Sequence, residues 1–541
     1  MEVSVVGSSQ TIVGKTESPF RNLGFSKSKQ IPFRSSRIGF DPMRNCRRAS
    51  IRVALKAIRS EMCRSATVAG KKATGKILRE KSDNRVHLFV GLPLDCHNLQ
   101  HTRAIAAGLK ALKLLGVEGV DLPIWWGIVE KDTPGKYEWS NYLALAEMVR
   151  DAGLKLHVSI CFHASSKDPA VPLPQWVSQV GEAQPDIFFT DRSGRRFREC
   201  LSLGVDDLPV LDGKTPVRVF EEFCESFKSS FSAFMGSTIT DITVGLGPDG
   251  ELRYPSFQQA TGHQSMGVGE FQCYDKHLLN HLKQQASSIG HSNWGLSGPH
   301  DAPQYDGSPD SHNFIRESGG SWDTPYGEFF LSWYSNQLLS HGNRLLSLAS
   351  SVFADSNITV SGKVPVMHSY YRTRSHPSEL TAGYYNTVHR DGYNAVAEMF
   401  ARNHCKMIIP SMELSDEHQP NGLRSSPDSL LSQIMAACKM HGVGVTGENS
   451  SKSSIPGGFD KIKERILSSS SENVMVDSFM YQRMGAYFFS PEHFPMFTKF
   501  VRSLDQVELH SDDLPDLNEE AMVSSITTGS ELVNDLQRQA V

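Results

Sequence analysis

The chain has 541 residues, of which 39% are hydrophobic and 21% charged, and its formal net charge at pH 7 is −4. These values are typical of a globular protein with a large core, and they exclude a strongly basic nucleic-acid-binding protein. The nine cysteines are scattered and odd in number, so they fit neither a disulfide framework nor a zinc site, and no apolar run reaches the ~18 residues of a membrane span. We therefore expect a soluble protein of a reducing compartment that uses no cofactor and binds neither nucleic acid nor a membrane.

The two ends of the chain differ in composition from the middle. Residues 1–83 are rich in serine and arginine and poor in acids, which is typical of an organelle transit peptide. A disordered basic tail that binds an acidic partner is the alternative. Residues 509–541 are acidic and short of aromatic residues, so we expect a mostly disordered tail there.

Between these ends, residues 84–508 alternate strand-like apolar runs with amphipathic helices. Continuous apolar strands that alternate with helices predict a parallel sheet, and about eight of them predict a (β/α)₈ TIM barrel of the α/β class. The expected strands are Val86–Leu92, Val117–Ile124, Leu156–Phe162, Ile239–Leu246, Val364–His368, Lys406–Met412, Gly442–Thr446 and Val474–Tyr481.

Two of the intervening helices have clear signals. Ile105, Leu109 and Leu112 share one helical face, and Gly116 ends that helix. Thr215-Pro216 predicts an N-cap and first-turn proline. The helix that follows has aromatic residues at three- and four-residue spacing: Phe220, Phe223, Phe227, Phe231 and Phe234.

Two long segments, 164–214 and 287–326, lack clear periodicity and are rich in Gly, Pro, Ser and Asp. Loops longer than ~15 residues inside a compact domain are usually functional. Because the first follows a strand, we expect these segments to form a lobe over the C-terminal face of the barrel, around a deep pocket.

Polar and aromatic side chains gather where the expected strands end. TIM barrels hold their active sites at the C-terminal ends of the strands, so these residues are candidates for one site. A lone histidine or arginine among them is as readily a structural group. The set is Asp95, Trp125, Trp126, His163, Glu251, His368, Glu413, Glu448 and Arg483.

Other chemistries fit less well. Gly245-Leu-Gly-Pro-Asp-Gly250 matches the dinucleotide pattern formally, but Pro248 lies inside it and no helix opens at Gly250. The sequence contains no H-E-x-x-H pair, which would predict a metal site, and no G-x-S-x-G elbow, which would predict a serine hydrolase. Two strand-end carboxylates, Glu251 and Glu448, favour glycoside hydrolysis, which needs an acid and a base on opposite sides of a sugar.

Five segments of the chain carry motifs that are specific to one enzyme family. The segment 245–257 (GLGPDGELRYPSF) resembles the catalytic-acid signature of plant β-amylases, glycoside hydrolase family 14. The segments 267–276, 329–335, 379–386 and 446–449 also resemble that family, in the same order. The resemblance covers roughly residues 86–504 and implies a (β/α)₈ barrel and an inverting, exo-acting α-1,4-glucan maltohydrolase.

The resemblance also implies roles for individual residues. Glu251 matches the general acid that protonates the glycosidic oxygen, and Glu448 the general base that activates water. An inverting pair holds its carboxyls ~6.5–9.5 Å apart. The residues that match glucan-holding positions of the family are His163, Lys363, His368, Asn449, Ser450 and Arg483.

Several positions depart from the family. Residues 164–169 replace a longer lid that carries a sugar-binding aspartate; Asp168 is either a displaced remnant or a turn cap before Pro169. Pro123 replaces an aspartate at the closed end of the pocket, and Pro410 a threonine of the mobile inner loop. Contacts to the sugar also change where Ser369-Tyr370 replaces a Trp-Trp pair, His263 a tryptophan, Phe257 a tyrosine and Ser451 a leucine.

These departures lead to a main hypothesis and two alternatives. The main one is a chloroplast-stromal β-amylase homologue that hydrolyses α-1,4-glucan very slowly or not at all, and serves starch metabolism by sensing glucan or maltose or by binding a partner protein. The second is an active β-amylase that releases β-maltose. The third is a barrel enzyme for another glycoside.

Overall fold

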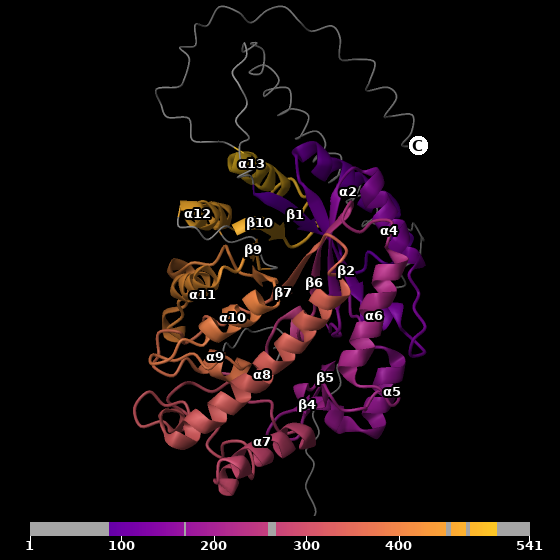
Figure 1. Cartoon of the computed structure of the whole chain (residues 1–541). Coiled ribbons are helices and arrows are strands. Elements are labelled where there is room, and N and C mark those ends of the chain that lie inside the picture. Colours follow the sequence, from indigo (N-terminus) through magenta and orange to yellow (C-terminus); the bar gives the residue numbers. More distant parts are fainter. Residues whose placement is uncertain (1–85, 167–168, 258–266, 451–455, 472–475, 506–541) are drawn as a thin grey trace, which may run out of the picture. The chain divides into compact units, whose positions relative to one another are not determined.

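The computed structural model describes residues 86–166, 169–257, 267–450, 456–471 and 476–505. Eight parallel strands close into a barrel in the order β1-β10-β9-β8-β7-β6-β3-β2 (Figure 1). The predicted (β/α)₈ barrel is therefore confirmed. The strands are β1 His87–Gly91, β2 Gly119–Trp125, β3 Lys155–Cys161, β6 Ile239–Val244, β7 Thr359–Lys363, β8 Lys406–Ile409, β9 Val445–Glu448 and β10 Val476–Tyr481.

Helices surround this barrel on its outer side (Figure 1). The longest, α8, begins at Pro325 with Thr324 as its N-cap and ends at Val352. The α-helices are α2 Thr102–Leu115, α3 Trp126–Val129, α4 Ser140–Asp151, α5 Gln175–Ala183, α6 Pro216–Ser230, α7 Lys276–Ser288, α8 Pro325–Val352, α9 Pro377–Ala382, α10 Tyr393–Arg402, α11 Pro427–His441, α12 Gly458–Ser471 and α13 Phe494–Asp505.

Both helices with clear sequence signals form as predicted, with one difference. Gly116 follows α2 in the left-handed region at φ 91°, where a glycine is favoured. Thr215 caps α6 by accepting a hydrogen bond from the Arg218 N–H. However, α6 ends at Ser230, so Phe231 and Phe234 lie beyond the helix, although both are buried.

Two predicted strands were placed wrongly. The fifth strand is β7, Thr359–Lys363, and not Val364–His368. Pro365 lacks an N–H and cannot continue a strand ladder, so the apolar run after Lys363 leaves the barrel. The seventh strand begins at Val445 rather than Gly442, because Gly442 is the left-handed C-cap of α11, and it extends to include Glu448.

The segments after β3 and β6 form a lobe at the C-terminal end of the barrel (Figure 1). Part of it is regular structure that lacked a sequence signal. Strand β4 (Phe188–Thr190) pairs antiparallel with β5 (Arg196–Leu201), and α5 precedes them. Ala164 N–H donates to the Glu199 carbonyl at 2.6 Å, so β5 runs beside the chain that leaves β3.

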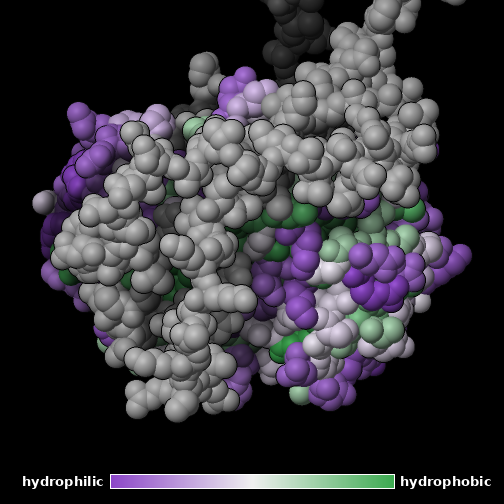
Figure 2. All heavy atoms as spheres, turned by 90° about the horizontal axis from the view of Figure 1, so that it is seen from above, coloured by the Kyte–Doolittle hydropathy of each residue, from purple (hydrophilic) through white to green (hydrophobic). Residues whose placement is uncertain are grey.

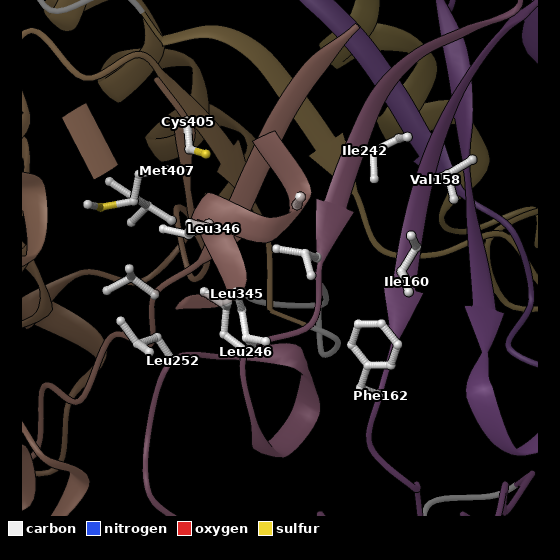
Figure 3. Close-up of a cluster of buried hydrophobic side chains, with 14 of the residues drawn as sticks. Val158, Ile160, Phe162, Ile242, Leu246, Leu252, Leu345, Leu346, Cys405 and Met407 are labelled. Carbon is white, nitrogen blue, oxygen red and sulfur yellow. The ribbon is translucent and has the colours of Figure 1, made fainter. Parts of the chain in front are cut away.

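The barrel strands present different side chains to their two faces. Along β3, Val158 and Ile160 pack outward among the hydrophobic side chains of Figure 3, which include Leu345 and Leu346 of α8. Alternate residues of a strand point to opposite sides, so Ser159 points into the barrel interior.

This interior carries polar groups. His157 Nε2 lies 2.6 Å from Thr243 Oγ1, which lies 2.9 Å from Ser361 Oγ. Ser159 Oγ donates to Asp121 Oδ1 at 2.7 Å. Polar groups therefore occupy part of the barrel interior below the strand ends, beside apolar side chains such as Phe89, whose ring lies 5.9 Å from that of His157.

Where Figure 2 shows described residues, the surface is mainly hydrophilic, with small hydrophobic patches between. In the described part of the chain, no helix combines the length and the apolar character that a membrane crossing requires.

Candidate active site

A cavity of about 390 Å³ opens at the C-terminal ends of the barrel strands. Most residues predicted from the sequence to form the site line it: His163, Glu251, Lys363, Glu448, Asn449, Ser450 and Arg483. His368 is not among its lining residues, although its neighbour Met367 is. Of the strand-end set, Trp125, His163, Glu251, Glu448 and Arg483 are thus brought together. Asp95, Trp126 and Glu413 are not lining residues, and Trp126 is fully buried. The roles assigned to the site residues remain predictions.

Glu251 is held by the turn that follows β6. The short helix Pro248–Gly250 reverses the chain, and Glu251 then pairs with Lys363 in a parallel β-bridge. Arg253 Nε donates to Glu251 Oε2 at 2.8 Å, and the same guanidinium binds Asp249 at 2.8 Å. Among the described residues none donates to Glu251 Oε1, so this oxygen is the one available to a ligand.

Glu448 ends β9 and is only 3% exposed. Lys363 Nζ forms an ion pair with its Oε1, and Gln482 Nε2 donates to its Oε2 at 2.8 Å. Burial by itself would lower the pKa of Lys363, but the negative charges of Glu448 and Glu251 outweigh burial and raise it. Each oxygen of Glu448 retains a further lone pair that can accept a hydrogen bond from water.

Lys363 therefore links the two glutamates. Its backbone bridges to Glu251, its carbonyl accepts a hydrogen bond from the Leu252 N–H at 2.8 Å, and its ammonium pairs with Glu448. Both carboxylates line the same cavity. This placement is what an acid and base that act on one sugar linkage need, and the separation expected for an inverting pair stays a prediction.

Gln482 is a site residue that the sequence analysis missed. Its N–H donates to Asn449 Oδ1 at 2.6 Å, its carbonyl accepts from Asn449 Nδ2 at 3.1 Å, and its Oε1 accepts from Arg483 at 2.8 Å. Arg483 also donates to the Leu92 carbonyl at 2.7 Å. The only available signal was its position between Tyr481 and Arg483 at the end of a strand.

Ser450 is fixed by the loop that follows β8. Its N–H donates to Glu413 Oε1 at 2.7 Å, and its hydroxyl donates to the same oxygen. Burial raises the pKa of Glu413, and the hydrogen bonds from Ser450 oppose this rise. Glu413 therefore acts on the cavity through Ser450.

The departures from the family pattern fall partly on this cavity. Pro123, Pro410 and Ser411 line it, so proline occupies two of its positions. Ser369 and Tyr370 are buried. In the shortened segment after β3, Ser165 and Val171 exchange two backbone hydrogen bonds of 2.8 Å. Asp168, His263 and Ser451 lie outside the described residues.

Arg465 of α12 holds the loop that carries Pro410. It donates to the Met412 carbonyl at 2.7 Å and to Asp428 Oδ1 at 2.6 Å.

We expect Arg465→Met to lower the free energy of unfolding by about 1–3 kcal/mol, because a buried carbonyl loses a charged donor. Backbone amides of residues 411–414 should also exchange faster with deuterium. The matched control is Arg402→Met, which removes an exposed ion pair with Glu398 and should leave both measurements unchanged.

Cys161 also lines the cavity. All seven described cysteines are buried. Burial raises the pKa of the Cys161 thiol, and it raises the pKa of Cys405 to about 11 and that of Cys438 to about 12. No group of three or more His, Cys, Asp or Glu side chains in the described ranges could hold a metal ion.

A closed parallel barrel whose strand ends bring two glutamates to one cavity is an arrangement typical of glycoside hydrolases. The family model of glycosyl hydrolase family 14 matches residues 89–507. The chain belongs to this family.

Comparisons with individual proteins agree with this assignment. The chain is 52% identical to inactive beta-amylase 9 of Arabidopsis thaliana, over 98% of each chain. It is 41% identical to the chloroplastic beta-amylase 2 of Oryza sativa subsp. japonica, over 82% of each. Among solved structures, the catalytic domain of beta-amylase from Paenibacillus polymyxa superposes with a TM-score of 0.65 at 26% identity, covering 78% of this chain and 99% of that one.

Proposed function

We propose that this protein is a β-amylase homologue of starch metabolism that binds α-1,4-glucan but hydrolyses it very slowly or not at all. The observation that carries the proposal is the composition of the cavity, which is lined by Glu251 and Glu448 and also by Pro123 and Pro410. The family resemblance implies sugar-holding groups at the two positions that the prolines occupy. A relative that is 52% identical bears the name inactive beta-amylase 9. This name supports the proposal that hydrolysis is very slow or absent.

The size of the expected loss follows from the missing contacts. A hydrogen bond to a charged group contributes about 1.5–3 kcal/mol. The lid aspartate, the aspartate replaced by Pro123 and the hydroxyl replaced by Pro410 would together account for a loss of about three or more powers of ten in rate. Retaining two glutamates does not offset this loss, because the reaction depends on holding the sugar in the reactive geometry.

The proposed location is the chloroplast stroma. The basic, serine-rich residues 1–83 have the composition of a transit peptide. Relatives from Oryza sativa and Arabidopsis thaliana are named chloroplastic. Fusion of residues 1–83 to a fluorescent protein tests the proposal, since the signal should coincide with chlorophyll. In this setting the protein would report glucan or maltose, or act through a partner protein.

An active β-amylase is the second candidate, because both glutamates line the cavity. The purified full chain is incubated with soluble starch and with maltoheptaose, and maltose release is compared with the rice relative and with the Glu251→Gln variant. We expect release at least about a thousandfold below the rice protein. Robust release that Glu251→Gln abolishes would establish the active enzyme instead. Activity only on a glycoside other than starch would indicate a different substrate.

A further inference from the structure

The floor of the cavity lies inside the barrel, below the two glutamates. Asp121 and Pro123 of β2 line it together with Ser159 of β3 and Thr243 of β6. Outward-facing neighbours on the same strands, such as Leu122 and Val158, belong to the hydrophobic core. The polar residues of the barrel interior therefore form part of the cavity wall.

Asp121 is the charged group on this floor, and its own partners do not satisfy it. The side chain is 1% exposed, and Ser159 Oγ donates to its Oδ1 at 2.7 Å. In the described structure no group donates to its Oδ2, and no lysine or arginine lies within ion-pair distance of the carboxylate. A buried carboxylate requires hydrogen-bond donors, so the oxygen beside the cavity favours a ligand that can donate.

Asp121 lies two residues before Pro123 on β2. Residues two apart on a strand share one face and lie ~6.6 Å apart. Both line the cavity. The acceptor that proline cannot supply at position 123 is thus present on the same strand, one pleat deeper in the barrel.

The charges around the cavity indicate the kind of ligand. Four carboxylates line it, those of Asp121, Asp249, Glu251 and Glu448, together with the cations Lys363 and Arg483. Arg253, which is not a lining residue, pairs with Glu251 and Asp249, so Asp121 is the lining carboxylate without an ion pair in the described structure. Lys363 is already paired with Glu448. An anionic ligand would meet net repulsion near the floor, whereas a neutral polyhydroxylated molecule would find acceptors and hydroxyls.

We propose that Asp121 and Ser159 form a hydroxyl-binding subsite that holds the end of a neutral α-glucan chain at the bottom of the cavity. The subsite rests on the proposed function, because it specifies how the glucan is held. Asp121 accepts a hydrogen bond from a sugar hydroxyl through Oδ2, while Ser159 fixes the carboxylate through Oδ1. The glucan end is therefore seated deeper than a ligand held at position 123.

Isothermal titration calorimetry on the full chain tests this assignment, with maltotriose as the probe and maltose 1-phosphate as its anionic counterpart. We expect Asp121→Asn to weaken maltotriose binding about ten- to a hundredfold, because a charged acceptor is lost. Ser159→Ala should weaken it by a smaller factor. Asp477→Asn is the matched control, since this residue pairs with Lys406 outside the cavity, and it should bind like the wild type. Thermal unfolding of each variant verifies that it is folded.

The outcomes separate the subsite from the proposed function. Wild-type binding that Asp121→Asn leaves unchanged overturns the subsite while glucan binding stands. Absence of binding by the folded wild type overturns both. Binding of maltose 1-phosphate at least as tight as that of maltotriose also overturns the subsite, since a carboxylate floor disfavours an anion. Should Asp121→Asn not fold, unchanged binding by Ser159→Ala overturns it.

Discussion

Lys363→Met is expected to lower the free energy of unfolding by about 3–5 kcal/mol, because removing one partner of a buried ion pair leaves an uncompensated charge. Glu448 has a side chain only 4% exposed, and Lys363 one of 17%. Without the ammonium, Glu448 keeps only the amide of Gln482 as a hydrogen-bond donor. Denaturant unfolding followed by tryptophan fluorescence measures the change.

The matched control for this prediction is Lys406→Met. Lys406 pairs with Asp477 at 2.6 Å, and both side chains are about a quarter exposed, at 26% and 27%. Partly solvated pairs contribute little, so we expect a loss below about 1 kcal/mol. The double variant Lys363→Met/Glu448→Leu should regain part of the lost stability, since neither charge is then buried alone. Equal losses for the two single lysine variants would contradict the account.

Acidification is expected to destabilise the wild type through His368 between pH 6.5 and about 4. Burial lowers the pKa of this imidazole from 6.5 to about 4, although the charge of Asp416 opposes the shift. Its Nδ1 is buried without a hydrogen-bond partner in the described structure. The unfolded chain takes up the proton first as the pH falls, so the stability present above pH 6.5 is lost toward pH 4. The loss amounts to about 3 kcal/mol.

The pH prediction is tested by difference. His368→Gln should remove this part of the pH dependence, so its free energy of unfolding, compared with that of the wild type, should rise as the pH falls. Burial also raises the pKa of Asp275 to about 6, and this carboxyl acts in the opposite sense in the same range. Asp275→Asn is therefore the control that separates the two contributions. A wild type and His368→Gln variant with parallel profiles would refute the assignment.

The sequence predicted the barrel because most of its strands are mainly apolar and alternate with amphipathic helices. It misplaced β7, whose Ser361, Gly362 and Lys363 are not apolar. Ser361 faces the polar groups of the barrel interior, where the usual preference for branched side chains does not apply. The apolar residues that follow were taken for the strand, and Pro365 among them was the signal that should have excluded them.

The candidate site was largely predictable because strand ends and family motifs coincide. His368 is the exception, since it lies outside the cavity lining while its backbone carbonyl accepts a hydrogen bond from the Ser426 N–H at 3.2 Å. Gln482 and Asp121 could not be predicted. Their importance comes from contacts between different strands, such as those of Gln482 with Glu448, and no spacing along the chain encodes them.

The burial of the cysteines limits how oxidants can act on this protein. Only the thiolate reacts with peroxide or with a disulfide, and a thiol with a pKa of about 11, as for Cys405, is ionised in about one molecule in a thousand at pH 8. Burial and a raised pKa therefore both disfavour reaction of the barrel thiols with oxidants. The remaining two cysteines, Cys46 and Cys63, lie in residues 1–83, the proposed transit peptide, so the protein left after its removal would carry only the buried thiols.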